Sequence, residues 1–223
     1  MTSRQRGRAA QLDKGERVRK PRAQSVARHA TVLCLLSIFV ALAFGPGLRG
    51  AFIHDDSAQI VENPWLQSPH LDLRLLTSDV WGYKAEKGEG WSDYWRPVFS
   101  LWLYLNSRLF GLNETGGWHA ANILLHILVG AIAYGLLLSL QIPRAVSAVI
   151  AILFSVHPSQ VESVIWISGS PNMLSAAPLL AALWTIVSDA RRPKHWKRML
   201  APGLFALTRS DNRRSTARRC RQG

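Results

Sequence analysis

The chain has 223 residues, of which 48% are hydrophobic, and a formal net charge of +13. The charge is concentrated at the two ends: residues 1–29 hold nine basic and two acidic side chains, and residues 189–223 hold eleven and two. The apolar content excludes disorder throughout, two cysteines exclude a disulfide framework, and the uneven charge argues against nucleic acid binding. The composition therefore indicates a membrane protein with several spans and two basic ends.

Four segments are apolar enough to be candidate membrane helices, each of which needs about 20 mostly apolar residues. In chain order they are 30–52, 117–140, 145–167 and 172–187. The third can cross only if its helix continues past Pro158, which places Glu162 near one membrane face. The first could also be a cleaved signal peptide, with a site at Ala41-Leu42-Ala43, but the charged region before it is unusually long.

The charge pattern predicts the sidedness of these spans. Short segments rich in Lys and Arg stay in the cytoplasm, so two basic ends require an even number of crossings. Four crossings make 1–29 and 189–223 cytoplasmic tails, the second disordered from about residue 208, and place loop 53–95 outside. We interpret 97–110 as an amphipathic helix at the outer interface; a fifth span is the alternative. The predicted fold is all-α and polytopic, with one membrane domain at 30–188.

The unusual polar residues gather on the external side of this topology. Each also has an ordinary interpretation: adjacent acids often cap or solvate a turn, and polar groups often join membrane helices by hydrogen bonds. An ionisable residue within an apolar helix more often faces a cavity or a partner. The candidate site residues are Asp55, Asp56, Arg96, His119, Asn122, His157 and Glu162.

No pattern for a metal or a cofactor is present. His157 and Glu162 are five positions apart, which turns them about 140° from each other on an ideal helix. No P-loop, dinucleotide fingerprint or nucleophile elbow occurs. Asn113-Glu114-Thr115 is a glycosylation sequon that only a protein of the secretory pathway could use. We therefore expect neither a metal nor a cofactor.

Several blocks, in this order, resemble one known family. The blocks are Phe52-Ile53-His54-Asp55-Asp56 with Gln59–Pro64, then Tyr94-Trp95-Arg96-Pro97-Val98, Trp118–Asn122 through His126, and Phe154–Glu162 with Trp166-Ile167-Ser168-Gly169. Over about residues 30–207 they are similar to the transmembrane and tetratricopeptide-repeat O-mannosyltransferases and their bacterial relatives. Each block is weak alone, and the ordered set is fairly specific.

The resemblance implies the GT-C fold of membrane glycosyltransferases, here in part. Such enzymes transfer a sugar from a polyprenyl-phosphate donor to a hydroxyl, here of a protein, on the external or lumenal side. The membrane is then a bacterial inner membrane or the endoplasmic reticulum. The resemblance places the catalytic base on Asp55 or Asp56, and donor or substrate binding on Arg96, His119, Asn122, His157 and Glu162.

The chain departs from the family pattern in two places. Gly169-Ser170-Pro171-Asn172 replaces a motif that carries Arg and an acid, and Arg-rich sequence follows Leu207 where family members continue into further membrane helices and repeats. We therefore expect a truncated product that is inactive alone. Two alternatives stay open: a non-catalytic membrane protein that docks a partner or lipid through loop 53–95 and its basic tails, and a transporter.

Overall fold

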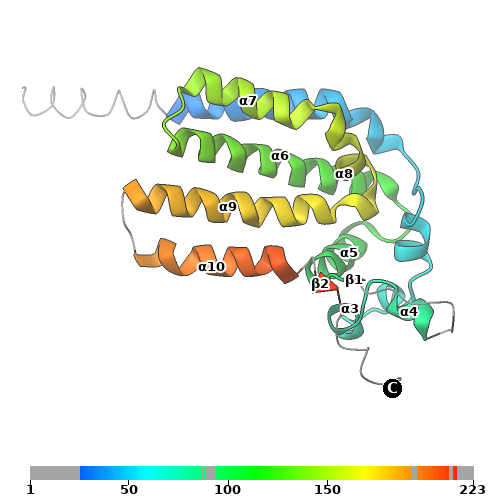
Figure 1. Cartoon of the computed structure of the whole chain (residues 1–223). Helices are drawn as coiled ribbons and strands as arrows, with labels where there is room; N and C mark the ends of the chain where they lie inside the picture. Colours follow the sequence, from blue (N-terminus) through cyan, green and yellow to red (C-terminus); the bar gives the residue numbers. More distant parts are fainter. Residues whose placement is uncertain (1–25, 87, 89–93, 192–194, 211–212, 215–223) are drawn as a thin grey trace, which may run out of the picture.

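The structure is a computed structural model that describes residues 26–86, 88, 94–191, 195–210 and 213–214. Its main body is a layer of long helices lying side by side (Figure 1). They are the N-terminal helix, which with a terminal 3₁₀ turn η1 (Gly45–Arg49) covers Val26–Arg49, and α6 (Thr115–Ser139), α7 (Arg144–Val156), α9 (Pro171–Arg191) and α10 (His195–Ser210). The protein is an all-α polytopic membrane protein, as the apolar segments predicted.

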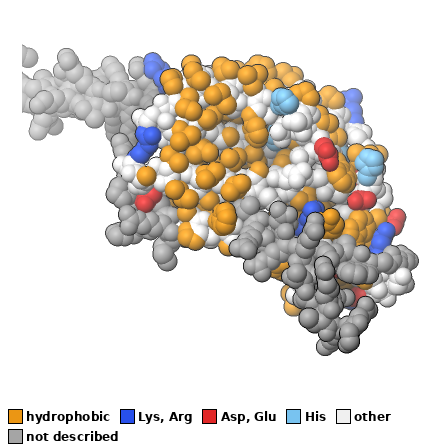
Figure 2. Space-filling model, in the orientation of Figure 1, with side chains coloured by type: hydrophobic (Ala, Val, Ile, Leu, Met, Phe, Trp, Pro, Cys, Tyr) orange, Lys and Arg blue, Asp and Glu red, His pale blue; other side chains and the backbone are white. Residues whose placement is uncertain are grey.

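The candidate spans of the structure overlap the apolar segments of the sequence. Val26–Arg49, Thr115–Ser139 and Ile167–Arg191 are each long and apolar enough to cross a membrane. Arg144–Val156 and Pro158–Ile165 qualify together, as a pair bent by 50°. Figure 2 shows hydrophobic side chains over the side of this helical body and charged ones toward its two ends, the distribution expected of lipid-facing helices.

The third span is a broken helix rather than the continuous one that we expected. α7 ends at Val156, and a 3₁₀ turn η3 (Pro158–Gln160) leads into the short helix α8 (Val161–Ile165). Pro158 has no backbone N–H to donate to the helix. Its ring also disfavours a helical conformation at the residue before it, so the helix ends there. The bend directs α8 toward the end of the first span, where the side chain of Ile165 packs so closely on Gly47 that a Cβ there would lie 2.3 Å from it.

The loop after the first span folds into a compact cap at one end of the helical layer (Figure 1). It contains the π-helical turn η2 (Ser57–Val61), the single-turn helices α2 (Pro64–Gln67), α3 (Arg74–Thr77) and α4 (Gly82–Ala85), and the strand β1 (Tyr94–Trp95). A second hydrophobic core lies beneath them, separate from the one between the long helices. Its buried members include Trp65, Tyr83, Phe99 and Trp118.

Helix α5 (Pro97–Phe110) runs across the other helices and is seen nearly end-on in Figure 1. Phe99 and Leu103 face the cap core, whereas Leu101, Leu105 and Leu109 are exposed. These three are spaced i, i+4, i+8, so they form one stripe along the helix. An amphipathic helix with an exposed leucine stripe, set across the spans, has the geometry of an interfacial helix, and that assignment stays a prediction.

The C-terminal region differs from its expected arrangement. We expected residues 189–223 to be a basic cytoplasmic tail. Instead α10 returns alongside α9, and its distal end reaches α5. Arg213–Arg214 form a strand, β2, that pairs antiparallel with Tyr94–Trp95 of the loop expected to be external. Loop 53–95 and residues 213–214 therefore lie on the same side, and the two expectations cannot both hold.

The disorder expected from about residue 208 stays a prediction, although the described residues of that segment have regular structure. α10 continues to Ser210 and β2 follows. A helix already packed on a neighbour can extend past a charged residue, because most helix stability in proteins comes from that packing. Residues 1–25, 211–212 and 215–223 lie outside the described part of the chain, as do the expectations made for them.

Candidate functional site

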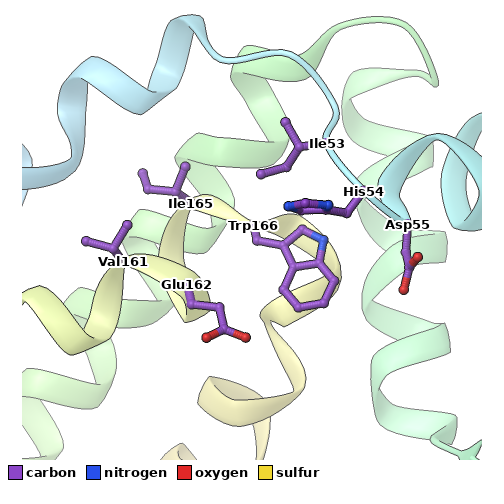
Figure 3. A pocket seen from close by; sticks show the side chains of 7 residues that line it. All are labelled: Ile53, His54, Asp55, Val161, Glu162, Ile165 and Trp166. Carbon is purple, nitrogen blue, oxygen red and sulfur yellow. The ribbon is translucent and has the colours of Figure 1, made fainter.

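A pocket of about 510 Å³ lies where the cap meets the broken third span (Figure 3). One side is formed by Ile53, His54 and Asp55, directly after the first span, and the other by residues of α8 and Trp166, which follows it. This volume is typical of sites that bind small molecules or short chain segments. The pocket therefore brings together two sequence blocks that are more than 100 residues apart.

The two adjacent acids of the first loop have different surroundings. Asp55 is exposed and lines the pocket. Asp56 is fully buried. Its Oδ1 accepts hydrogen bonds from the backbone N–H and the hydroxyl of Ser168, at 2.8 and 2.7 Å, and its Oδ2 accepts one from the Ile53 N–H at 3.2 Å. Asp56 thus joins the cap to the turn before the fourth span, and Asp55 is the acid that a ligand can reach.

Glu162 is the second carboxylate of the pocket. It lies in the first turn of α8 and is exposed. In Figure 3 its carboxylate and that of Asp55 lie on opposite sides of the Trp166 indole. Neither carboxylate forms an ion pair with a described residue, and the lining holds no Lys or Arg. The pocket is therefore acidic, with an aromatic wall between two negative charges.

His54 and Trp166 are pocket residues that the sequence reasoning did not select. Their rings meet edge to face, with centroids 6.0 Å apart. His54 has a φ of 49°, an uncommon conformation for a residue with a side chain, and such strained positions cluster at functional sites. His54 directly precedes the acids, and Trp166 opens the last block of the resemblance. The positions of His54 and Trp166 within those blocks were the only sequence signal that could have identified them as site residues.

His119 and Asn122 lie under the pocket, in the first turns of α6, and do not line it. His119 is 1% exposed, and neither ring nitrogen has a hydrogen-bond partner among the described residues. The Asn122 amide donates to the Val164 carbonyl at 3.3 Å and accepts from the Trp102 indole at 3.4 Å. Asn122 therefore joins three helices, which is the ordinary role of a polar residue between membrane helices.

Arg96 and His157 are also outside the pocket lining. The Arg96 guanidinium stacks over the Tyr94 ring at 5.0 Å, at the start of α5. His157 caps η3: its Nδ1 accepts a hydrogen bond from the Ser159 backbone N–H at 3.2 Å and lies 2.7 Å from the Ser159 hydroxyl. Of the seven residues selected from the sequence, the structure thus brings Asp55 and Glu162 together in the pocket. Asp56, His119 and Asn122 are buried and lie outside its lining.

The described residues contain no group of three His, Cys, Asp or Glu side chains arranged to hold a metal ion. The chemistry available in the pocket is that of two carboxylates, an imidazole and an indole. Carboxylates and imidazoles are the usual acids and bases of enzymes.

The fold and the pocket define a class: a multi-pass helical membrane protein with an acidic site at one end of its spans. Sequence comparison shows that the chain is similar to protein O-mannosyl-transferases, among them those named TMTC. It is 35% identical over 156 residues to human protein O-mannosyl-transferase TMTC1, covering 69% of this chain and 17% of that protein. It is 33% identical over 177 residues to protein O-mannosyl-transferase F38B6.6 of Caenorhabditis elegans, covering 77% and 25%.

A third relative, mouse TMTC4, is 34% identical over 150 residues, or 60% of this chain and 20% of that protein. The chain therefore spans about a fifth of the length of the curated relatives that it matches. No protein-family model matches the chain, and no solved structure matches it.

Proposed function

We propose that this chain forms the acceptor side of a membrane mannosyltransferase site, with Asp55 as the base. The observation that supports this most directly is the different burial of the paired acids: Asp56 is fully buried in structural hydrogen bonds, and Asp55 faces a pocket. The relatives are described as protein O-mannosyl-transferases, which adds support from an independent direction.

The reaction is the transfer of a mannose-like sugar from a polyprenyl-phosphate donor to a Ser or Thr hydroxyl of a protein. The hydroxyl oxygen attacks C1 of the sugar, the bond from C1 to the phosphate oxygen breaks, and polyprenyl phosphate leaves. Asp55 takes the hydroxyl proton as the new bond forms. A general base in this position contributes about 10²–10⁴-fold to a rate.

The leaving phosphate gains negative charge and requires a cation or N–H donors near it. The pocket lining holds no Lys or Arg, and its two carboxylates, Asp55 and Glu162, would repel a phosphate. We therefore place the acceptor in the pocket and the donor phosphate outside it. Arg96 is the candidate for the phosphate, since it lies at the start of α5, the helix with the exposed leucine stripe.

The same proposal also implies which side of the membrane each part of the chain faces. The cap and the pocket face the external side or the lumen, and residues before Val26 lie in the cytoplasm. Chain 1–223 by itself should transfer no sugar, because it spans only 17–25% of its relatives, and a lipid-linked donor needs further membrane helices to enclose it.

The proposal is tested in a chimera in which residues 30–207 replace the matching segment of human TMTC1. Mannose transfer to a protein acceptor is measured in membranes from cells that lack the endogenous relatives. Asp55→Ala should lower transfer by about 10²–10⁴-fold. The matched control is Asp72→Ala, which removes a loop carboxylate that does not line the pocket. If Asp55→Ala in an active chimera transfers sugar as fast as the parent, Asp55 is not the base.

A further inference from the structure

The turn between α5 and α6 carries the one Asn-X-Ser/Thr sequon of the sequence, Asn113-Glu114-Thr115. A sequon can be used only where the asparagine is accessible and the backbone around it is not locked in regular structure. Asn113 is exposed and lies in a turn, and Glu114 is extended, with φ −93° and ψ 92°. Thr115, whose hydroxyl completes the sequon, is the first residue of α6.

This turn lies at the cap end of the helices and outside the lipid-facing part of α6. The helix has 25 residues, so it is about 37 Å long and exceeds the hydrocarbon thickness of about 30 Å. Its first turn belongs to the cap: Trp118 is 1% exposed in the cap core, and its indole N–H donates to the Gly111 carbonyl at 2.9 Å. Asn113 is therefore held beside the cap.

We propose that Asn113 is an N-glycosylation site, modified when the chain is inserted into the endoplasmic reticulum membrane. The co-substrate is an oligosaccharide linked to a lipid pyrophosphate. A bond forms between Asn113 Nδ2 and C1 of the first sugar, and the bond from C1 to the pyrophosphate oxygen breaks. The amide gives one proton to a base of the transferring enzyme, and lipid pyrophosphate leaves.

The inference rests on the sidedness of the proposed function and not on its chemistry. If the cap is lumenal, Asn113 is presented to the lumen whether or not Asp55 acts as a base. The sequon therefore reports the orientation of the cap independently of any transfer by this protein.

The test is translation of the full chain in the presence of endoplasmic reticulum microsomes, followed by alkaline carbonate extraction and gel electrophoresis. The extracted membranes should hold a single slower-migrating form that an N-glycan-specific endoglycosidase converts to the unmodified mobility. Asn113→Gln and Thr115→Ala should abolish this form, and Thr115→Ser should retain it because the hydroxyl remains. A chain that stays unmodified, or a shift that persists in Asn113→Gln, overturns the proposal.

A relocated sequon supplies the matched control. The substitution Ala23→Asn completes a sequon with Gln24 and Ser25 before the N-terminal helix, and in the Asn113→Gln background this sequon should stay unmodified. Modification there would mean that the opposite end faces the lumen, which also overturns the proposal. Asp55→Ala, which removes the carboxylate without creating a sequon, should keep the wild-type shift, so that loss of mannose transfer and loss of the glycan remain separate results.

Discussion

Asp56 offers the sharpest test of how the cap is held on the spans. Its carboxylate accepts three hydrogen bonds, two from Ser168 at 2.8 and 2.7 Å and one from the Ile53 N–H at 3.2 Å, and it is fully buried. Asp56→Ala removes every acceptor and leaves three donors without partners. Each orphaned buried donor costs about 1–3 kcal/mol, and partial relaxation of the turn reduces the sum to about 3–5 kcal/mol.

For a chain of this length, about 1 kcal/mol corresponds to roughly 2–4 °C in melting temperature. Asp56→Ala should therefore lower the melting temperature of the detergent-purified protein by about 6–20 °C, measured by the loss of monodisperse protein on heating. Asp55→Ala is the matched control: its side chain is exposed, and surface substitutions usually stay within about 0.5 kcal/mol. Equal melting of the two variants would refute the division of roles between the paired acids.

Three further outcomes are expected. Gly50→Ala should destabilise the protein, because a Cβ there would lie 3.0 Å from a backbone carbonyl and 3.2 Å from a buried histidine ring, whereas Gly45→Ala, with open space around it, should melt near the wild type. The hydrogen bonds from Arg74 lower the pKa of Asp72, so this contact stabilises above the unfolded pKa and is lost as pH falls through the folded pKa; in a carboxyl NMR titration Arg74→Gln should raise that pKa. In a chain whose Cys34 and Cys220 are replaced by Ser, Tyr94→Cys combined with Arg214→Cys should form a disulfide on oxidation because the two residues are partners in the β1–β2 pair, and an absence of cross-linking in the folded protein would refute that pairing.

The long helices could be predicted from sequence because a membrane span is a local property. About 20 apolar residues must satisfy their backbone hydrogen bonds internally, so the segment forms a helix whatever surrounds it. The expected span 117–140 differs from Thr115–Ser139 by two residues at one end and one at the other. Pro158 was noted in the sequence, but neither the bend there nor the direction of α8 was predicted, because both depend on packing against the first span.

The site required contacts that sequence patterns do not carry. Asp55 and Asp56 are chemically identical neighbours, and only the turn at Ile53–Asp56 determines which one points inward. The inward one is recognised by Ser168, 112 positions later, through a residue type too common to attract notice. The path of α10 was missed for a related reason: its polar end forbids an independent span, but not a helix that packs on α9.

The break in the third span leaves one backbone carbonyl without its helical hydrogen bond, and a side chain of a neighbouring helix supplies the missing partner. Ending α7 at Val156 leaves the Ser155 carbonyl without its helical partner, since the Ser159 N–H bonds to His157 Nδ1 instead. In a bilayer no water is present to bond such an oxygen. His126 of α6 lies with Nε2 2.8 Å from the Ser155 carbonyl oxygen.

This contact fixes the tautomer of His126, because a carbonyl can only accept and Nε2 must therefore carry the hydrogen. The rings of Phe44 and Phe154 flank the imidazole, and its Nδ1 is buried with no partner among the described residues. Nε2 of His126 thus donates the hydrogen bond that a backbone N–H would supply in an unbroken α7. The other ring nitrogen, Nδ1, is enclosed by apolar rings. A proton relay that used Nε2 of His126 would have to break this hydrogen bond to the Ser155 carbonyl.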